Sequence, residues 1–393
     1  MNRPISPFSL LLSAFIFFLA LFLFAFLVPL PIPPYLDFQV LYHADLGLLR
    51  GVPLYDRAGQ AGMIAGLAGV AADQVFVLPF PYPPWYALVT LPLALLPIEV
   101  AARLWFGLNL SMLMISVWLL TDGWRASPRL ASFLAAIVFV PVLGGLYVGQ
   151  FVFPVLLGAA LTTYALRREN AALTGLAAAF LTFKPHLGGA IAGAVLFWLF
   201  LRRDDFSRRA LKAILLAAGL LFISGFLADP RWPVSYLHSL FGFRNLPGVS
   251  SCELCASLPV GLVALAAGRA DIGPALPLGA ALFVGLFVAL VLFRREVFRA
   301  PAALVAASSL VTLLADPYLF NYDFVLLLVP LFFLAWSARR MDWLWLALVY
   351  FFPLLLLALL GRGANLFLPL AALALLFLQI TRARPIDVSP RPA

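Results

Sequence analysis

The stretch that decides the fold is residues 31–56, which reads PIPPYLDFQVLYHADLGLLRGVPLYD. It follows a long apolar run and opens with prolines, and it contains three aspartates, Asp37, Asp45 and Asp56. Ionisable residues at the boundary of a membrane are costly to place and usually serve a function. The stretch is therefore the first candidate for chemistry in a chain with few charges.

Residues 37–50 are predicted to form an amphipathic helix, with Asp37 as its N-cap and Gly51 as its stop signal. At 100° per residue its apolar residues share one face: Phe38, Leu41, Leu48 and Leu49. Such a helix is expected to lie on or against the membrane. Asp45 falls inside the apolar face, where a carboxylate needs a partner or a purpose.

Composition places the chain in a bilayer. Of its 393 residues 64% are hydrophobic and only 11% are charged, whereas a soluble domain is about half apolar and a quarter charged. The net charge of +9 comes from short basic clusters between apolar runs, which is typical of cytoplasmic loops rather than of a nucleic-acid partner. No nucleic acid is expected.

We predict an all-α polytopic membrane protein with about twelve transmembrane helices, forming a single domain over residues 1–393. Residues 8–28 are too long for a signal-peptide core and are predicted to be the first span. The proline-rich stretch 80–97 is expected to be a broken or re-entrant helix. Because the basic clusters occupy alternate loops, the large loops 31–84 and 229–256 are expected on the extracytoplasmic side.

Lys184 is the most informative charge outside the first loop. It ends a segment without any other charge, and Pro185 breaks the helix directly after it. Together with His186 it is suited to a phosphate group at the membrane surface. The alternative is a lysine that extends its ammonium to the lipid headgroups.

Five other positions are candidates for substrate binding. Gln150 could bind sugar hydroxyls or cap a helix, and Tyr322 lies in the outer stretch DPYLFNYD. His238 and Arg244 could bind a polar headgroup or belong to an interfacial aromatic belt. Asp45, within the predicted amphipathic helix, is the remaining candidate.

No cofactor or metal site is expected. The sequence contains no phosphate-binding glycine loop and no zinc-protease motif. Cys252 and Cys255 could form a local disulfide or remain free thiols. The sequence also has no appreciable cytoplasmic domain that could bind a nucleotide, so any donor substrate must be reached from the membrane.

Several stretches in order resemble glycosyltransferase family 87: DFQVLYHADLGLLRGVPLYD, FPYPPWYALVTLPLALLP, GQFVFPVLLGAALTTYALRRENAALTGLAAAFLTFKPH and ADPYLFNYD. The resemblance implies a GT-C-type helical bundle. It also implies a polyprenyl-phosphate sugar donor, with mannose as the sugar, and a glycolipid, polysaccharide or protein acceptor. The active site would face the periplasm from the bacterial inner membrane.

The resemblance also implies roles for particular residues. Asp37 matches the aspartate of the family's first outer loop, the general base, and Gln150 matches the glutamine of its GQ motif. Lys184 and His186 match the motif near the donor phosphate. Direct attack opposite the phosphate would invert the anomeric centre and would need one base.

Two alternatives from other classes stay open. A lipid or lipid-linked-sugar transporter would bind a headgroup through the same basic residues but would need no base. A non-catalytic subunit of an envelope-assembly complex would tolerate changes around Asp37.

Overall fold

The computed structural model describes most of the chain between residues 36 and 381. The described residues are 19–20, 23–24, 26–27, 36–75, 77–78, 80–243, 245–246, 249–252, 254–293, 297, 300–336, 338, 340–358 and 367–381. Within these ranges the chain is helical and contains no strand. Most of the predicted first span, and Arg244, lie outside the described residues.

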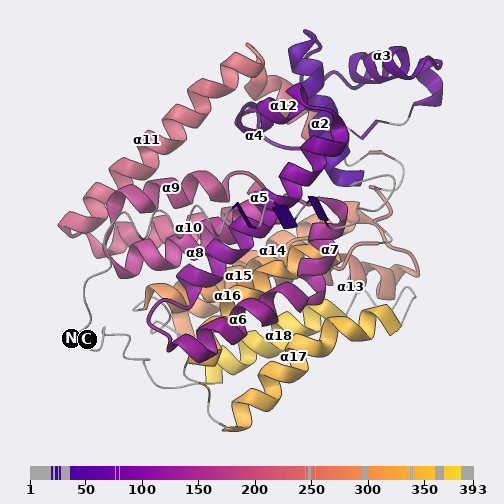
Figure 1. The fold of residues 1–393 in the computed structure, drawn as a ribbon. Coiled ribbons are helices and arrows are strands. Elements are labelled where there is room, and N and C mark those ends of the chain that lie inside the picture. The colour runs from indigo at the N-terminus through magenta and orange to yellow at the C-terminus, as the bar shows by residue number, and fades with distance from the viewer. Residues whose placement is uncertain are drawn as a thin grey trace.

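The helices follow one another with short connections (Figure 1). In the first half they are α2 (Leu36–Leu49), α3 (Arg57–Ala68), the 3-10 helix η1 (Ala72–Gln74), α4 (Pro84–Thr90), the 3-10 helix η2 (Leu91–Leu95), α5 (Ile98–Leu120), α6 (Ala126–Val138), α7 (Val140–Val148), α8 (Val152–Arg167), α9 (Ala171–Leu181) and α10 (Pro185–Arg202). In the second half they are α11 (Asp205–Ala228), α12 (Trp232–Phe243), α13 (Leu258–Ala267), α14 (Ile272–Phe293), α15 (Pro301–Ala315), the 3-10 helix η4 (Asn321–Leu327), α16 (Leu328–Trp336), α17 (Arg340–Ala358) and α18 (Phe367–Thr381).

Several of these helices can cross a membrane. In the described part of the chain four are long and apolar enough, namely α5, α10, α11 and α14, and the pair α6 and α7, bent by 54°, could form a fifth span. Helices such as α8 and α9 are apolar but shorter. The described part of the chain is thus all-helical and contains helices that can cross a membrane, and the number of about twelve spans stays a prediction.

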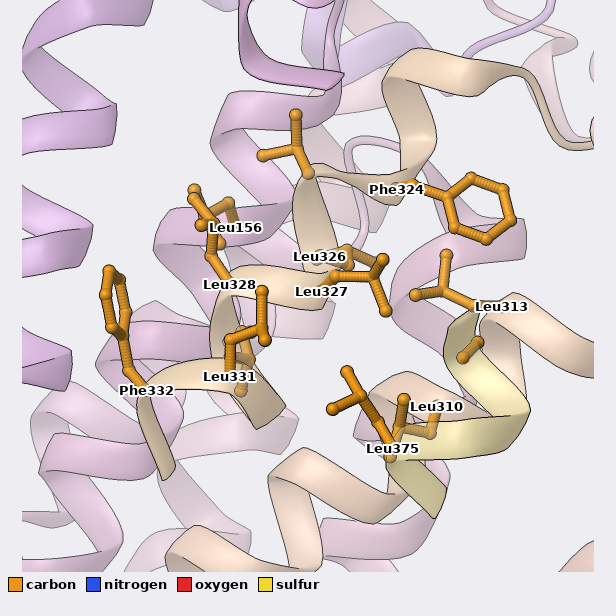
Figure 2. Packing of buried hydrophobic residues seen from close by; sticks show 14 of the residues in the cluster. Leu156, Leu310, Leu313, Phe324, Leu326, Leu327, Leu328, Leu331, Phe332 and Leu375 are labelled. Carbon is orange, nitrogen blue, oxygen red and sulfur yellow. The ribbon is translucent and has the colours of Figure 1, made fainter. Parts of the chain in front are cut away.

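The largest hydrophobic core is built around α15, η4 and α16 (Figure 2). Figure 2 shows leucines of these elements meeting Leu156 of α8 and Leu375 of α18. Phe324, at the start of this core, is completely buried. The core therefore fixes the position of η4, whose first residues enter the functional site.

A second core lies where α2, α4 and η2 meet, near α3 and α12 at one end of the molecule (Figure 1). Phe38 and Leu41 of α2 are completely buried there, against residues such as Tyr86 and Trp105. The expected helix is present, but its polar and apolar residues are mixed around the helix axis, and protein covers Phe38 and Leu41 where the sequence predicted contact with the membrane. Residues 83–97 pack against α2. This stretch is divided into the short helices α4 and η2 by four prolines, at positions 83, 84, 92 and 97.

Candidate functional site

The turn at Gly149 and Gln150 supplies the centre of the site. Gly149 ends α7 in the left-handed conformation (φ 69°, ψ 39°), which glycine adopts without a steric penalty. Two side chains of α5 hold the turn: Trp105 Nε1 donates to the Gly149 carbonyl (2.9 Å), and Asn109 Nδ2 donates to the Gln150 carbonyl (3.3 Å). The buried side chain of Gln150 therefore has a fixed starting point.

The amide of Gln150 connects a carboxylate with an ammonium. Its Nε2 donates to Asp37 Oδ2 at 2.8 Å. Its Oε1 accepts from the Phe151 backbone N–H at 2.8 Å and from Lys184 Nζ at 3.4 Å. Because the amide oxygen is the acceptor and the amide nitrogen the donor, these partners leave Gln150 one orientation. Asp37 and Lys184, distant in sequence, are thus neighbours.

Lys184 lies in the break between α9 and α10. Pro185 is the first residue of α10, and the residue before a proline is disfavoured in the helical conformation, so Lys184 lies outside both helices (φ −131°, ψ 82°). Its side chain is buried, and Nζ forms an ion pair with Asp323 Oδ1 at 2.5 Å. The ammonium faces the protein interior rather than the lipid headgroups.

Asp323 is the site residue that sequence reasoning did not select. It lies in the first turn of η4, completely buried, and its Oδ2 accepts from the Phe320 backbone N–H at 2.9 Å. A lysine expected at membrane depth needs an acidic counter-ion, and DPYLFNYD contains acids at both ends. That signal was present, but 139 residues separate the two partners, and nothing local indicated which acid would meet Lys184.

The environment of Asp37 changes its acidity. Burial raises the pKa of the Asp37 carboxyl to about 6, against the opposing effect of the Lys184 charge. The negative charge of Asp323 raises this pKa as well, and the hydrogen bond from Gln150 lowers it. A carboxyl group with a pKa near neutral can accept and return a proton under physiological conditions.

Two more predicted residues border this cluster. The ring centroid of Tyr322 lies 5.2 Å from Lys184 Nζ, a cation–π distance, and the ring stacks on Phe320. His186 is exposed in the first turn of α10, and its ring is 6.4 Å from that of Tyr318. Tyr322 thus contacts the ammonium, whereas His186 lies at the edge.

The remaining predicted residues are not joined to the cluster. Asp45 is completely buried beside Thr90, apart from Asp37 and Lys184. Burial raises its pKa well above the ordinary value. His238 is exposed on α12, and in the described part of the chain no hydrogen bond or ion pair ties it to Asp37 or Lys184. Arg244 is outside the described residues.

A disulfide-closed turn packs against the segment that precedes η4. Cys252 and Cys255 are bonded and buried, in a cluster with Tyr318 and Phe320. The turn is tied to the segment before η4 by a hydrogen bond from the Ala256 backbone N–H to the Leu319 carbonyl (2.7 Å). Of the two states that the sequence left open, the structure has the disulfide.

The cluster can hold and move a proton beside a buried cation. Asp37, Gln150, Lys184 and Asp323 come from α2, the α7–α8 turn, the α9–α10 break and η4. In the described ranges no group of three or more His, Cys, Asp or Glu side chains is placed to hold a metal ion. The chemistry this chain's own side chains offer is that of a general base and a positive charge.

Comparison with known proteins identifies one family. The model described as Glycosyltransferase family 87 matches residues 80–320, more than half of the chain. Gln150 and Lys184 lie inside the matched range, whereas Asp37 and Asp323 lie outside it. No curated protein and no solved structure matches the chain.

Proposed function

Because the chain belongs to glycosyltransferase family 87, it is an enzyme that transfers a sugar, and we propose that Asp37 is its general base. We further propose that the donor is a polyprenyl-phosphate sugar, most suitably mannose, and that the acceptor is a hydroxyl of a glycolipid, polysaccharide or protein. One observation carries the proposal: Gln150 hydrogen-bonds both Asp37 and Lys184, so a base and a cation flank one position.

In the proposed reaction the acceptor hydroxyl oxygen attacks the anomeric carbon and forms the new glycosidic bond. The bond between that carbon and the phosphate oxygen breaks, and the electron pair leaves with polyprenyl phosphate. The hydroxyl proton passes to Asp37. The departing phosphate is already an anion, so it needs a positive neighbour rather than an acid, and one displacement inverts the anomeric centre.

The side chains have the capacity for these roles. Asp37 is only half-buried, so a hydroxyl can approach its carboxylate, and its raised pKa makes it a stronger base than an ordinary aspartate. An ammonium has three N–H donors. In Lys184 one points to Asp323 and one to Gln150, which leaves one for a phosphate oxygen. Tyr322 and the exposed His186 would border the donor.

The disulfide supports an extracytoplasmic site. Disulfides persist in oxidising compartments, and the Cys252–Cys255 turn packs against Tyr318 and Phe320, just before η4. We propose a single polytopic domain of about twelve spans in a bacterial inner membrane, with the cluster facing the periplasm. Residues 31–84 and 229–256 would then be the two large outer loops.

Asp37→Asn tests the base. The wild type and this variant, purified in detergent, are assayed for sugar transfer from a panel of polyprenyl-phosphate sugars to a glycolipid extract, with the exposed Asp205→Asn as the matched control. We expect Asp37→Asn to lose about two to four orders of magnitude in kcat while donor binding is retained. Equal transfer by Asp37→Asn and wild type would remove Asp37 from the mechanism. Donor binding without transfer by any of the proteins would contradict the donor assignment.

A further inference from the structure

The Cys252–Cys255 disulfide closes a turn that packs against the segment between α15 and η4. Both cysteines are buried, and the chain contains no other cysteine. Within the turn the Cys255 backbone N–H donates to the Cys252 carbonyl at 2.9 Å. Cys252 has a φ of 44°, in the left-handed region that residues with a side chain rarely adopt. The bond therefore holds closed a turn whose conformation Cys252 does not favour by itself.

Two hydrogen bonds tie this turn to the backbone of residues 316–320. The Ala256 backbone N–H donates to the Leu319 carbonyl at 2.7 Å, and Ser257 Oγ donates to the Asp316 carbonyl at 3.0 Å. Both donors belong to residues that are almost completely buried. Because buried hydrogen bonds are costly to break, a change in the turn must also move the segment that it holds.

Phe320 connects this segment with the ion pair of the site. Its ring packs against the buried cysteines, and its backbone N–H donates to Asp323 Oδ2 at 2.9 Å. The same ring stacks on that of Tyr322, with centroids 5.4 Å apart. Asp323 and Tyr322 both contact Lys184 Nζ, the first by an ion pair and the second at a cation–π distance. A short series of contacts thus leads from the disulfide to the ammonium.

The body of η4 is held in a different way from the residues before it. The side chains that follow Asp323 are completely buried in the largest core: Phe324, Val325, Leu326 and Leu327. Residues 318, 320 and 322 are only partly buried, and residue 321 is exposed. Opening of the turn should therefore disturb the residues around Asp323 and leave the main core intact.

We propose that the Cys252–Cys255 disulfide is a redox clamp that positions Asp323 and Tyr322 at Lys184, so that the site is complete only in the oxidised chain. The two cysteines are thus positioning residues. The part of this inference that concerns the donor rests on the proposed function, in which Lys184 binds the donor phosphate. The chain would become fully active only in an oxidising compartment.

The redox step is a thiol–disulfide exchange. Reduction breaks the Sγ–Sγ bond, and each sulfur gains one electron and one proton while a dithiol is oxidised to its own disulfide. Oxidation by a small disulfide such as oxidised glutathione restores the Sγ–Sγ bond and releases two thiols. The clamp can therefore be opened and closed in one preparation of the protein.

Hydrogen exchange tests the clamp without any transfer. The full chain in detergent is compared before and after reduction with dithiothreitol, and the thiols formed are counted by mass after alkylation. The backbone amides of Tyr318, Phe320 and Asp323 are all hydrogen-bonded in the oxidised chain. We expect these amides to exchange about tenfold faster after reduction, whereas those of α8 and α16 in the main core should keep their rates.

Transfer kinetics test the consequence for the site. We expect reduction to raise KM for the donor about tenfold and to leave KM for the acceptor unchanged, because Lys184 loses its fixed position. Burial raises the pKa of Asp37 most, and the charge of Asp323 raises it further, so displacement of Asp323 should move the midpoint of kcat/KM to lower pH. Reoxidation should restore both values, which distinguishes the clamp from an irreversible loss of folded protein.

The double variant Cys252→Ser/Cys255→Ser is the matched control for the reductant. It should have the exchange rates and the donor KM of the reduced wild type, and dithiothreitol should not change it further, since no cysteine remains. Equal exchange of residues 316–323 in oxidised and reduced wild type would overturn the proposal. Faster exchange throughout the chain would also overturn it, because the bond would then hold the whole fold.

The two measurements separate the clamp from the function on which it partly rests. An unchanged donor KM in a reduced chain that still transfers sugar would overturn the positioning role. If the oxidised wild type transfers from no polyprenyl-phosphate sugar, the proposed donor fails, and hydrogen exchange of residues 316–323 still decides whether the clamp exists.

Discussion

At the scale of single residues, Gln150 has the strongest influence on the site. Its amide is neutral, yet it determines where a negative and a positive side chain lie relative to each other. It also lowers the pKa of Asp37 by donating to the charged form of that carboxyl, against burial, which raises the pKa to about 6. The acidity of the proposed base is therefore a balance that substitutions can shift in either direction.

The first expected consequence is a pH profile. Asp37 acts as a base only when ionised, so kcat/KM should rise with pH and level off above a midpoint of about 6. The folded-state pKa is raised above the ordinary value of 3.8, so protonation of Asp37 favours the folded state as the pH falls below 6. Activity should therefore disappear on acidification, although the protonation of Asp37 does not lower the free energy of unfolding. A midpoint near 4 would contradict the assignment.

Gln150→Met tests the balance directly. Without the amide N–H the ionised form of Asp37 loses a partner, so its pKa and the midpoint of the kcat/KM profile should move to higher pH. Methionine keeps the length of the side chain, and Asn109 still holds the backbone of the turn. Profiles of wild type and variant are measured in parallel. An unchanged midpoint with lower kcat would mean that Gln150 acts only by positioning.

The sequence indicated part of this site. Asp37, Gln150, Lys184 and Tyr322 were selected because each is an unusual polar residue next to a predicted span, and the structure places them together. Asp45 was selected by the same reasoning, yet it is joined to none of them, because a helical pattern gives the face of a residue but not what covers that face. The roles of all of these residues stay predictions.

At the scale of elements, the joint between α9 and α10 determines where Lys184 points. The two helices pass so closely that a Cβ on Gly188 would lie 2.0 Å from the Leu181 carbonyl oxygen, a backbone atom that cannot turn aside. The next residue, Gly189, is exposed and has no atom within 4 Å of a new Cβ. Two adjacent glycines thus have very different surroundings.

Gly188→Ala should therefore destabilise the protein by about 1–3 kcal/mol and reduce transfer, because α10 must shift and carry Lys184 with it. Gly189→Ala is the matched control and should match or slightly exceed the stability of wild type, since alanine favours a helix. Melting temperatures in detergent and kcat provide the measurements. Equal melting temperatures for the two variants would contradict the close packing.

The ion pair that joins the α9–α10 break to η4 provides a double-mutant test. Lys184→Met leaves Asp323 buried without a cation and should cost about 3–5 kcal/mol. Adding Asp323→Asn removes that charge and keeps an acceptor for the Phe320 N–H, so the double variant should recover most of the stability. It should not recover transfer. If Lys184→Met is as stable as the wild type, the ion pair contributes nothing to the stability of the fold.

Elements were easier to predict than their neighbours. The helix beginning near Asp37 and the broken helix before Pro97 were both expected from capping residues and proline spacing, and both are present. The contact between these two elements was not expected, because the chain has many apolar surfaces and the sequence does not show which of them pack together. The apolar face of α2 is equally consistent with lipid and with protein when only its sequence is known.

At the scale of the whole molecule, the proposed topology gives the chain a periplasmic and a cytoplasmic side. Tyr147 is exposed on α7 beside the Gln150 turn, and Arg203 is exposed after α10. The two native cysteines are bonded to each other, so a single introduced cysteine would be the reactive thiol. The predicted orientation can be tested in a chain that is otherwise unchanged.

We expect Tyr147→Cys to react with a membrane-impermeant maleimide added to intact spheroplasts, and Arg203→Cys to react only after permeabilisation. The reason is that Tyr147 lies two residues before Gly149 at the proposed periplasmic site, whereas Arg203 follows Arg202 in one of the short basic clusters that are typical of cytoplasmic loops. Detergent-solubilised samples, in which both thiols should react, control for local reactivity. The reverse pattern would place the cluster on the cytoplasmic side and exclude the proposed compartment.

The Lys184–Asp323 pair also has a consequence for biosynthesis. The lysine is made 139 residues before Asp323, so for much of translation a growing chain carries the ammonium without the acid that forms its ion pair. A chain that stops before residue 323 keeps that defect permanently, together with an incomplete main core. We expect such fragments to remain incompletely folded at the membrane-insertion machinery and to be degraded. In this way the cell would never accumulate a product that has the base and the glutamine but only part of the enzyme.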